Sequence, residues 1–181
     1  RGHAKNIRSA NRPEAHKAVI RGYLKAREQT GVEWSIERIT GAITYILGLN
    51  GEVSAQSLAR IYKLNDHDAY PLATTLESIP ELRHGRKLGI ISNLPHDSLV
   101  YELESKGLAD VFDPIVVSYE VGYRKPHPAI YQEAIRRAQI SPEQGVFFSH
   151  DQEEVDGALA VGMQAHLAKN LAGVLSKLKT S

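Results

Sequence analysis

Three clusters of polar side chains follow short apolar runs, and together they could bind a negatively charged molecule. Ser92 and Asn93 form the first cluster, Lys125 ends the second, and Asp151 and Glu154 belong to the third. A hydroxyl, an ammonium group and several carboxylates that converge at one edge are what an anionic substrate requires, with or without a divalent cation. These residue types therefore favour a phosphate-type pocket.

Each of these signals alone also has a structural interpretation. A Ser-Asn pair after a strand often forms a turn, and acidic residues often begin a helix because they complement its dipole. Two histidines near the clusters are interpreted in the same way. His127 is expected to be an exposed residue at a helix entry, and His166 a strand histidine whose hydrogen bonds are satisfied.

The elements that must position the clusters alternate between short apolar runs and amphipathic helices. This pattern is typical of a parallel sheet with crossover helices, in which ligands bind at the carboxyl ends of the strands. The expected strands are residues 87–91, 115–118, 146–149 and 164–167, and the expected helices are residues 72–82, 97–106, 128–139, 153–161 and 171–178.

The segment before these repeats predicts helices only. Asn11-Arg12-Pro13-Glu14 is a helix-start signal, and the helix is expected to end at Gly31. A second helix begins near Ser35 and a third at Ser54. Because helices come first and β–α repeats follow, the fold class is expected to be α/β, with a helical cap on the N-terminal side of a doubly wound core.

The composition restricts the class of protein. Among 181 residues, 22 basic residues balance 21 acidic ones, so the totals do not predict a nucleic-acid-binding surface. The longest uncharged run, 13 residues from Ile39 to Gly51, is shorter than the roughly 18 residues of a membrane span. The chain has no cysteine, which excludes disulfides and thiol nucleophiles and favours a reducing cytoplasm.

Three segments, in this order, resemble the haloacid-dehalogenase-like superfamily: KLGIISN at 87–93, EVGYRKPHPAIY at 120–131 and VFFSHDQEEVDGALAVGM at 146–163. The superfamily includes Mg-dependent phosphatases and metal-free 2-haloacid dehalogenases. The resemblance covers about residues 70–167 and implies a Rossmann-like parallel sheet. We therefore assign residues 1–68 to the cap and residues 69–181 to the core, which lacks its first strand.

The resemblance also implies a role for each cluster. Ser92 would hydrogen-bond the transferring phosphoryl group or a substrate carboxylate, with Asn93 beside it. Lys125 would neutralise charge on the nucleophile and on the intermediate. The acidic segment, with Asp151 and Glu154, would hold Mg²⁺ if the protein is a phosphatase, and no metal is implied if it is a dehalogenase.

The family's first motif, a strand followed by the nucleophilic aspartate, has no good counterpart before Ser92. Asp66-His67-Asp68 follows no apolar strand and is interpreted as a turn. We therefore predict that about 15 to 25 residues lie upstream of Arg1 in the parent protein. In the acidic motif, Ser149 and His150 stand where the family has its acid pair, and Ser149 agrees with the metal-free dehalogenases. Tyr131 agrees with them as well.

The missing strand has a physical consequence. In the family fold it lies at the centre of the sheet, between the strand that ends at Ser92 and the strand that ends at Ser149. Each buried backbone group that it leaves unpaired costs about 1 to 3 kcal/mol. We therefore predict that the two flanking strands close up and pair, that a partner chain supplies a strand, or that the chain is part of a longer polypeptide.

The function implied for the parent protein is that of a phosphatase for a small phosphorylated metabolite, acting through an aspartyl-phosphate. A metal-free 2-haloacid dehalogenase and a non-catalytic member that binds an anion or a partner are the alternatives. The printed chain is expected to be inactive in either reaction, because Ser92 and Lys125 cannot replace the attacking aspartate. The substrate is expected to be a small anion, without nucleic acid or membrane partners, and a homodimer stays open.

Overall fold

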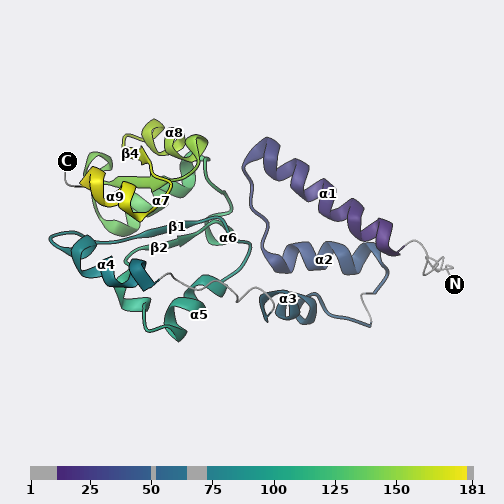
Figure 1. Ribbon diagram of the computed structural model, residues 1–181. Helices are drawn as coiled ribbons and strands as arrows, with labels where there is room; N and C mark the ends of the chain where they lie inside the picture. Colours follow the sequence, from purple (N-terminus) through teal and green to yellow (C-terminus); the bar gives the residue numbers. More distant parts are fainter. Residues whose placement is uncertain (1–11, 50–51, 65–72, 179–181) are drawn as a thin grey trace, which may run out of the picture.

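The computed structural model describes residues 12–49, 52–64 and 73–178. Its described residues form three helices, followed by an alternation of strands and helices. Figure 1 shows the three N-terminal helices beside the α/β part, with the segment between α1 and α2 on the side that faces the α/β part. The predicted fold class, α/β with parallel strands and helices on the N-terminal side, is confirmed.

The N-terminal helices are α1 (Arg12–Thr30), α2 (Ile36–Ile46) and α3 (Ala55–Leu64). The second begins as the sequence indicates, because the side chain of Ser35 accepts a hydrogen bond from the backbone N–H of Arg38 at 3.3 Å. Apolar side chains of α1 and α2 form one buried cluster: Val19, Tyr23, Ile39 and Ile43. This cluster holds the two helices together.

The α/β part has four short strands: β1 (Ile90–Ser92), β2 (Ile115–Val117), β3 (Val146–Ser149) and β4 (Gln164–Leu167). Its helices are α4 (Ala73–Arg83), α5 (Ser98–Ser105), α6 (Ser118–Val121), α7 (Pro128–Ala138), α8 (Gln152–Ala160) and α9 (Leu171–Leu178). The 3-10 turns are Ala109–Val111 and Pro142–Gln144. The bounds of β3 and β4 agree with the prediction, whereas α6 was not predicted.

The four strands form two separate parallel pairs. Strand β1 pairs with β2 in the register Ile90↔Ile115, and β3 pairs with β4 in the register Val146↔Gln164. Among the described residues no strand pairing joins β1 to β3. The prediction that these two strands close up and pair is therefore wrong, whereas the supply of a strand by a partner chain or by a longer polypeptide stays a prediction.

One apolar core packs against both strand pairs. Val116 of β2, Ile130 and Tyr131 of α7, and Phe147 of β3 belong to a single buried cluster. The rings of Tyr131 and Phe147 meet edge to face, with their centroids 5.4 Å apart. Side chains of α7 thus span the two pairs, so closing the sheet would require this packing to be rearranged.

The segment between α1 and α2 is tied by backbone hydrogen bonds to the loop before α7. The N–H of Arg124 donates to the carbonyl of Gly31 at 2.8 Å, and the N–H of Glu33 donates to the carbonyl of Gly122 at 2.9 Å. Val32 and Tyr123 form an antiparallel bridge between these bonds. The C-terminal end of α1 is therefore fixed against the loop that carries Lys125.

Two sequence predictions lie outside the residues that the structure describes. The interval 65–72 contains both Asp66-His67-Asp68 and the boundary predicted between residues 68 and 69. The domain boundary therefore stays a prediction. Within the described residues, no helix combines the length and the apolar character needed to cross a membrane.

Candidate functional site

Asn93 fixes the backbone of Lys125. Gly122 ends α6 with a φ of 81°, a left-handed conformation that favours glycine, and the chain then leads through Lys125 into α7. The side-chain oxygen of Asn93, directly after β1, accepts a hydrogen bond from the N–H of Lys125 at 2.8 Å. Its Nδ2 donates to the carbonyl of the same residue at 3.3 Å. These two bonds join the segments that follow β1 and β2.

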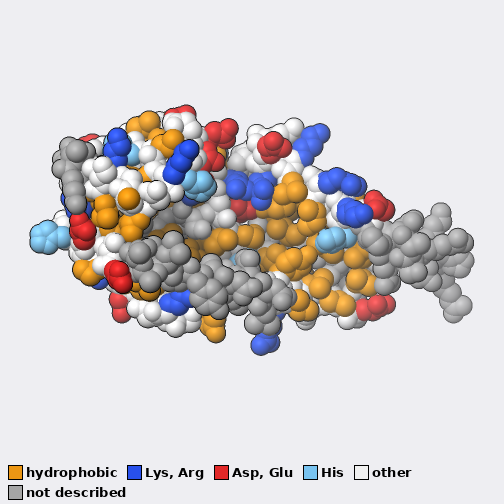
Figure 2. Space-filling view, in the orientation of Figure 1, with side chains coloured by type: hydrophobic (Ala, Val, Ile, Leu, Met, Phe, Trp, Pro, Cys, Tyr) orange, Lys and Arg blue, Asp and Glu red, His pale blue; other side chains and the backbone are white. Residues whose placement is uncertain are grey.

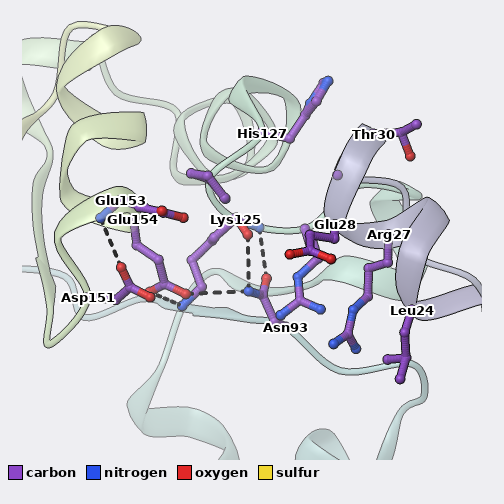
Figure 3. A pocket seen from close by; sticks show the side chains of 13 residues that line it. Leu24, Arg27, Glu28, Thr30, Asn93, Lys125, His127, Asp151, Glu153 and Glu154 are labelled. Carbon is purple, nitrogen blue, oxygen red and sulfur yellow. Dashed lines mark hydrogen bonds and ion pairs between the residues drawn. The ribbon is translucent and has the colours of Figure 1, made fainter. Parts of the chain in front are cut away.

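Glu154 is the acceptor on which the side chains of the site converge. The Lys125 Nζ lies 2.9 Å from Glu154 Oε2, and the two side chains are only 13% and 14% exposed. The Ser149 hydroxyl donates to the same oxygen at 2.7 Å, and Asn93 Nδ2 donates to Oε1 at 3.4 Å. Figure 3 shows Lys125 and Glu154 pointing toward one another, with Asn93 beside them.

The first turn of α8 is built around Asp151. Its side chain accepts the N–H of Glu153 at 2.9 Å and so caps the helix, while its own N–H donates to Ser149 Oγ at 3.2 Å. His150 is an exposed residue of the bend before the helix. The sequence predicted that a helix begins close to this residue. In the structure, one carboxylate oxygen of Asp151 is used in capping that helix.

Tyr131 of α7 and Gly157 of α8 lie where these two helices meet, next to the loop of residues 122–127, called here the lysine loop. The Tyr131 hydroxyl donates to the backbone carbonyl of Glu154 at 2.7 Å. Burial raises the pKa of Tyr131, and the charges of Glu154 and Asp151 raise it further, so this hydroxyl stays protonated as a donor. Gly157 lies so close to the loop that an added Cβ would be 2.6 Å from the carbonyl oxygen of Pro126.

A cavity of about 620 Å³ opens between α1 and the carboxyl ends of the strands. Figure 3 shows side chains of α1 on one side of it, and Asn93, Lys125 and the start of α8 on the other. The charged and polar side chains that line it are Arg27, Glu28, Thr30, Asn93, Arg124, Lys125, His127, Asp151, Glu153 and Glu154. Its size is within the range of small-molecule sites, roughly 300 to 1,000 Å³.

A second cavity, of about 330 Å³, is lined mostly by apolar side chains: Ile20, Tyr23, Leu24, Ile36, Ile39, Tyr62, Pro95 and His96. It shares Leu24 with the first cavity. Figure 2 shows hydrophobic side chains gathered over α1 and α2 in this part of the molecule. The charged cavity thus adjoins an apolar surface of the helical part.

The structure brings together four of the five predicted site residues. Asn93, Lys125, Asp151 and Glu154 line the larger cavity, but Ser92 is not among its lining residues. Ser92 is the last residue of β1, half-buried and in register with Val117. Its predicted contact with substrate is therefore untested by this geometry, and Asn93 contributes the polar side chain that is seen in the site.

The sequence analysis missed three residues that shape the site. Ser149 was considered only in place of a family acid, whereas its hydroxyl donates to Glu154. Arg27 and Arg124 line the cavity, and no spacing in the sequence relates the helix that carries Arg27 to the strand ends. Two signals were available, because Ser149 ends an expected strand and Arg124 directly precedes Lys125.

The two histidine predictions are corrected by packing. His127 does cap the start of α7, accepting the N–H of Ala129 at 3.2 Å, but it is half-buried, and its ring stacks on that of Tyr123 with the centroids 4.0 Å apart. The prediction of an exposed residue is therefore wrong. His166 was expected to have its hydrogen bonds satisfied, yet its Nε2 is buried without a hydrogen-bond partner and its ring lies 5.6 Å from that of Phe148.

The donor groups of the site do not by themselves fit a magnesium ion. Mg²⁺ requires oxygen ligands in near-octahedral geometry. Among the described residues, no group of three His, Cys, Asp or Glu side chains is placed to hold a metal ion. Of the two predicted ligands, Asp151 caps its helix and Glu154 is ion-paired with Lys125, whose ammonium group would repel a cation at that oxygen.

Comparison with known proteins agrees with the fold and with the ordered motifs. The family described as haloacid dehalogenase-like hydrolase matches residues 15–168. A glyceraldehyde 3-phosphate phosphatase from Methanothermobacter thermautotrophicus is 34% identical over 102 residues, 55% of this chain and 45% of the relative. The pyrophosphatase PpaX from Bacillus thuringiensis is 25% identical over 117 residues, 61% of this chain and 54% of the relative. The chain thus spans about half the length of these two relatives.

Two solved structures show the same fold. A 2-haloacid dehalogenase from Pseudomonas syringae pv. Tomato superposes with a TM-score of 0.62 and 22% identity, covering 89% of this chain and 69% of that one. The putative hydrolase YfnB from Bacillus subtilis, whose structure is bound to magnesium, superposes with a TM-score of 0.64 and 17% identity, covering 93% and 82%. At these identities the likeness concerns the fold alone.

Proposed function

Because the chain belongs to the haloacid dehalogenase-like hydrolases, we propose that it is part of a phosphatase that acts on a small phosphorylated metabolite. The observation that carries this proposal is Lys125 at the wall of a cavity of about 620 Å³, with its backbone held by Asn93 and its ammonium group paired with Glu154. Relatives named as phosphatases support it. Since the chain spans about half of their length, the activity of the whole protein is part of the proposal.

In this proposal Lys125 binds an oxygen of the phosphoryl group and offsets its negative charge as the charge increases in the transition state. Asn93 holds the lysine backbone, and Glu154 orients the ammonium group. Ser92, at the end of β1, would donate a further hydrogen bond to the phosphoryl group. These residues position and neutralise, and another group has to attack.

We place the attacking aspartate on a strand between β1 and β3, whose facing edges are unpaired among the described residues. Its carboxylate would attack phosphorus and release the alcohol, which takes a proton, to form an aspartyl-phosphate. Water would then hydrolyse that intermediate to phosphate and regenerate the carboxylate. Helices α1–α3 would act as the cap that closes over the substrate.

Activity assays test the proposal. A protein in which this chain follows a segment with such a strand is expected to hydrolyse phosphate monoesters, whereas residues 1–181 alone are not. In the active protein, Lys125→Ala should lower kcat/KM by about 10²- to 10³-fold because the charge of the transition state is no longer offset. The matched control is Lys87→Ala, since Lys87 is 64% exposed and does not line the cavity. Unchanged activity of Lys125→Ala would refute the role of the lysine.

A metal-free 2-haloacid dehalogenase is the second candidate, and the hydroxyl of Ser149 favours it. This residue donates to Glu154 at 2.7 Å in a site whose described donors do not fit Mg²⁺. Release of halide from a 2-haloacid that persists in the presence of a chelator, without phosphatase activity, would select this candidate. Phosphatase activity abolished by a chelator would select the first and would show that further oxygen ligands complete a metal site. A cytoplasmic location and a homodimer stay predictions.

A further inference from the structure

Two arginines line the cavity without a carboxylate partner. Arg27 comes from the last turns of α1, and Arg124 directly precedes Lys125. Both are half-buried. Among the described residues, no Asp or Glu side chain forms an ion pair with either guanidinium group; that of Arg27 lies 5.5 Å from the centre of the Tyr23 ring. The carboxylates of Glu28, Asp151 and Glu153 line the same cavity but form no ion pair with Arg27 or Arg124, so both guanidinium groups can bind an anionic ligand.

The fold links the two segments that carry these arginines, the end of α1 and the loop before α7. The N–H of Arg124 donates to the carbonyl of Gly31 at 2.8 Å, which joins the loop to the residue that follows α1. In Figure 3, Arg27 lies on the α1 side of the cavity, and Asn93 lies between it and Lys125. Neither arginine takes part in the ion pair of Lys125 and Glu154.

The charges of the side chains that line the cavity indicate what Arg27 and Arg124 would bind. The charge of Lys125 is already balanced by Glu154 at 2.9 Å, whereas those of Arg27 and Arg124 have no such partner. A guanidinium group matches the oxygens of a carboxylate or phosphate with two parallel hydrogen bonds. The cavity, about 620 Å³, also exceeds what a phosphoryl group alone requires and can hold a small metabolite.

We propose that Arg27 and Arg124 form a second anion subsite, so that the substrate carries a carboxylate or a second phosphate besides the phosphoryl group at Lys125. The identity of that first group rests on the proposed function. The subsite itself needs no chemistry, and binding alone can therefore test it. It would make the enzyme prefer phosphate esters that carry a second anionic group over esters of the same size whose alcohol part is uncharged.

Calorimetric titration with phosphonates, which cannot be hydrolysed as esters, measures the subsite directly. Methylphosphonate offers the phosphoryl group alone, whereas phosphonoacetate and 4-phosphonobutyrate add a carboxylate at two different spans. We expect at least one phosphonocarboxylate to bind about tenfold more tightly than methylphosphonate, a difference of about 1.4 kcal/mol. Arg27→Gln and Arg124→Gln should each remove most of that difference and leave the Kd of methylphosphonate within about twofold, far below a tenfold change.

Arg21→Gln is the matched control, because Arg21 is an exposed arginine of the same helix that does not line the cavity. It should bind all three ligands like the wild type. Arg27→Lys keeps a charge without the planar fork and should show an intermediate loss. Thermal unfolding of each variant verifies that it is folded.

Two results would overturn the proposal. If both Gln variants weaken methylphosphonate as much as the phosphonocarboxylates, the arginines bind the phosphoryl group itself. If neither variant changes any affinity, they have no role in binding. A 1,3-propanebisphosphonate titration tells a second phosphate from a carboxylate. Failure of the proposed function is separate, since it would appear as arginine-dependent binding without hydrolysis of any ester.

Discussion

Glu33 is a buried carboxylate that joins α1 to the segment after β2. It is 5% exposed and accepts hydrogen bonds from the Tyr23 hydroxyl and from Ser118 Oγ, the latter at 3.0 Å. Burial raises the pKa of Tyr23 to about 12, and the hydrogen bond and charge of Glu33 contribute to the rise. Because this folded-state pKa exceeds the unfolded value of about 10, the protonated hydroxyl stabilises the fold below pH 10. That contribution is lost as the pH rises toward 12.

Tyr23→Phe is therefore expected to change how stability depends on pH. At pH 7 the variant should be less stable by about 1 to 3 kcal/mol, because Glu33 keeps one hydroxyl donor instead of two. Between about pH 10 and pH 12 the wild type should lose more free energy of unfolding than the variant. Urea unfolding over this pH range measures both. Tyr45→Phe, at a residue that is 74% exposed, is the control, and parallel pH profiles for wild type and Tyr23→Phe would contradict the assignment.

Single residues of the site could be predicted where they follow strands. Asn93, Lys125, Asp151 and Glu154 were expected to converge because parallel strands end at one edge, and all four line one cavity. Arg27 could not be found in this way. It reaches the cavity through the hydrogen bonds that fix residue 31 to the lysine loop, a long-range contact that leaves no periodic trace in the sequence.

At the scale of the elements, the packing of α8 against the lysine loop depends on Gly157. A Cβ there would lie 2.6 Å from the carbonyl oxygen of Pro126 and 3.0 Å from Cε2 of Tyr131. Gly157→Ala should therefore push α8 away from the loop and cost about 1 to 3 kcal/mol of stability. It should also weaken methylphosphonate binding, because Glu154 moves with α8 relative to Lys125. Chemical unfolding and calorimetry measure the two effects.

Gly22→Ala is the matched control for this prediction. Gly22 also lies inside a helix, but nothing comes within 4 Å of the position where its Cβ would be. The substitution should stabilise the protein by about 0.5 to 1 kcal/mol, because alanine loses less conformational freedom in a helix. If both substitutions had the same effect, the close contact at Gly157 would not be limiting.

Most elements could be predicted, and the exceptions have local causes. The helix and strand periods indicated α1–α3 and all four strands, whereas the four residues of α6 are too few to show a period. Strand β1 is shorter than expected, beginning at Ile90 instead of residue 87. Its partner begins directly after Pro114, which has no N–H to donate and so limits the ladder at that end.

At the scale of the whole molecule, the two strand pairs share a core but no backbone hydrogen bonds among the described residues. The N–H of Ile90 donates to the carbonyl of Pro114 at 2.8 Å, so the N–H of Ile91 points to the opposite side of β1. The carbonyl groups of Gly145 and Ser149 accept bonds from the β4 side. By the same alternation, the N–H of Phe148 points away from β4.

These directions predict a pattern of hydrogen exchange. In residues 1–181 alone, the amides of Ile91 and Phe148 should exchange about tenfold faster, or more, than those of Ile90 and Phe147, which face the paired edges. In a protein whose additional strand lies between β1 and β3, all four amides should be protected. The carbonyl groups of that strand would accept hydrogen bonds from the N–H groups of Ile91 and Phe148. Slow exchange of Ile91 and Phe148 in residues 1–181 would mean that this chain fills the space itself. The proposal that the nucleophile arrives on a strand at that position would then be wrong.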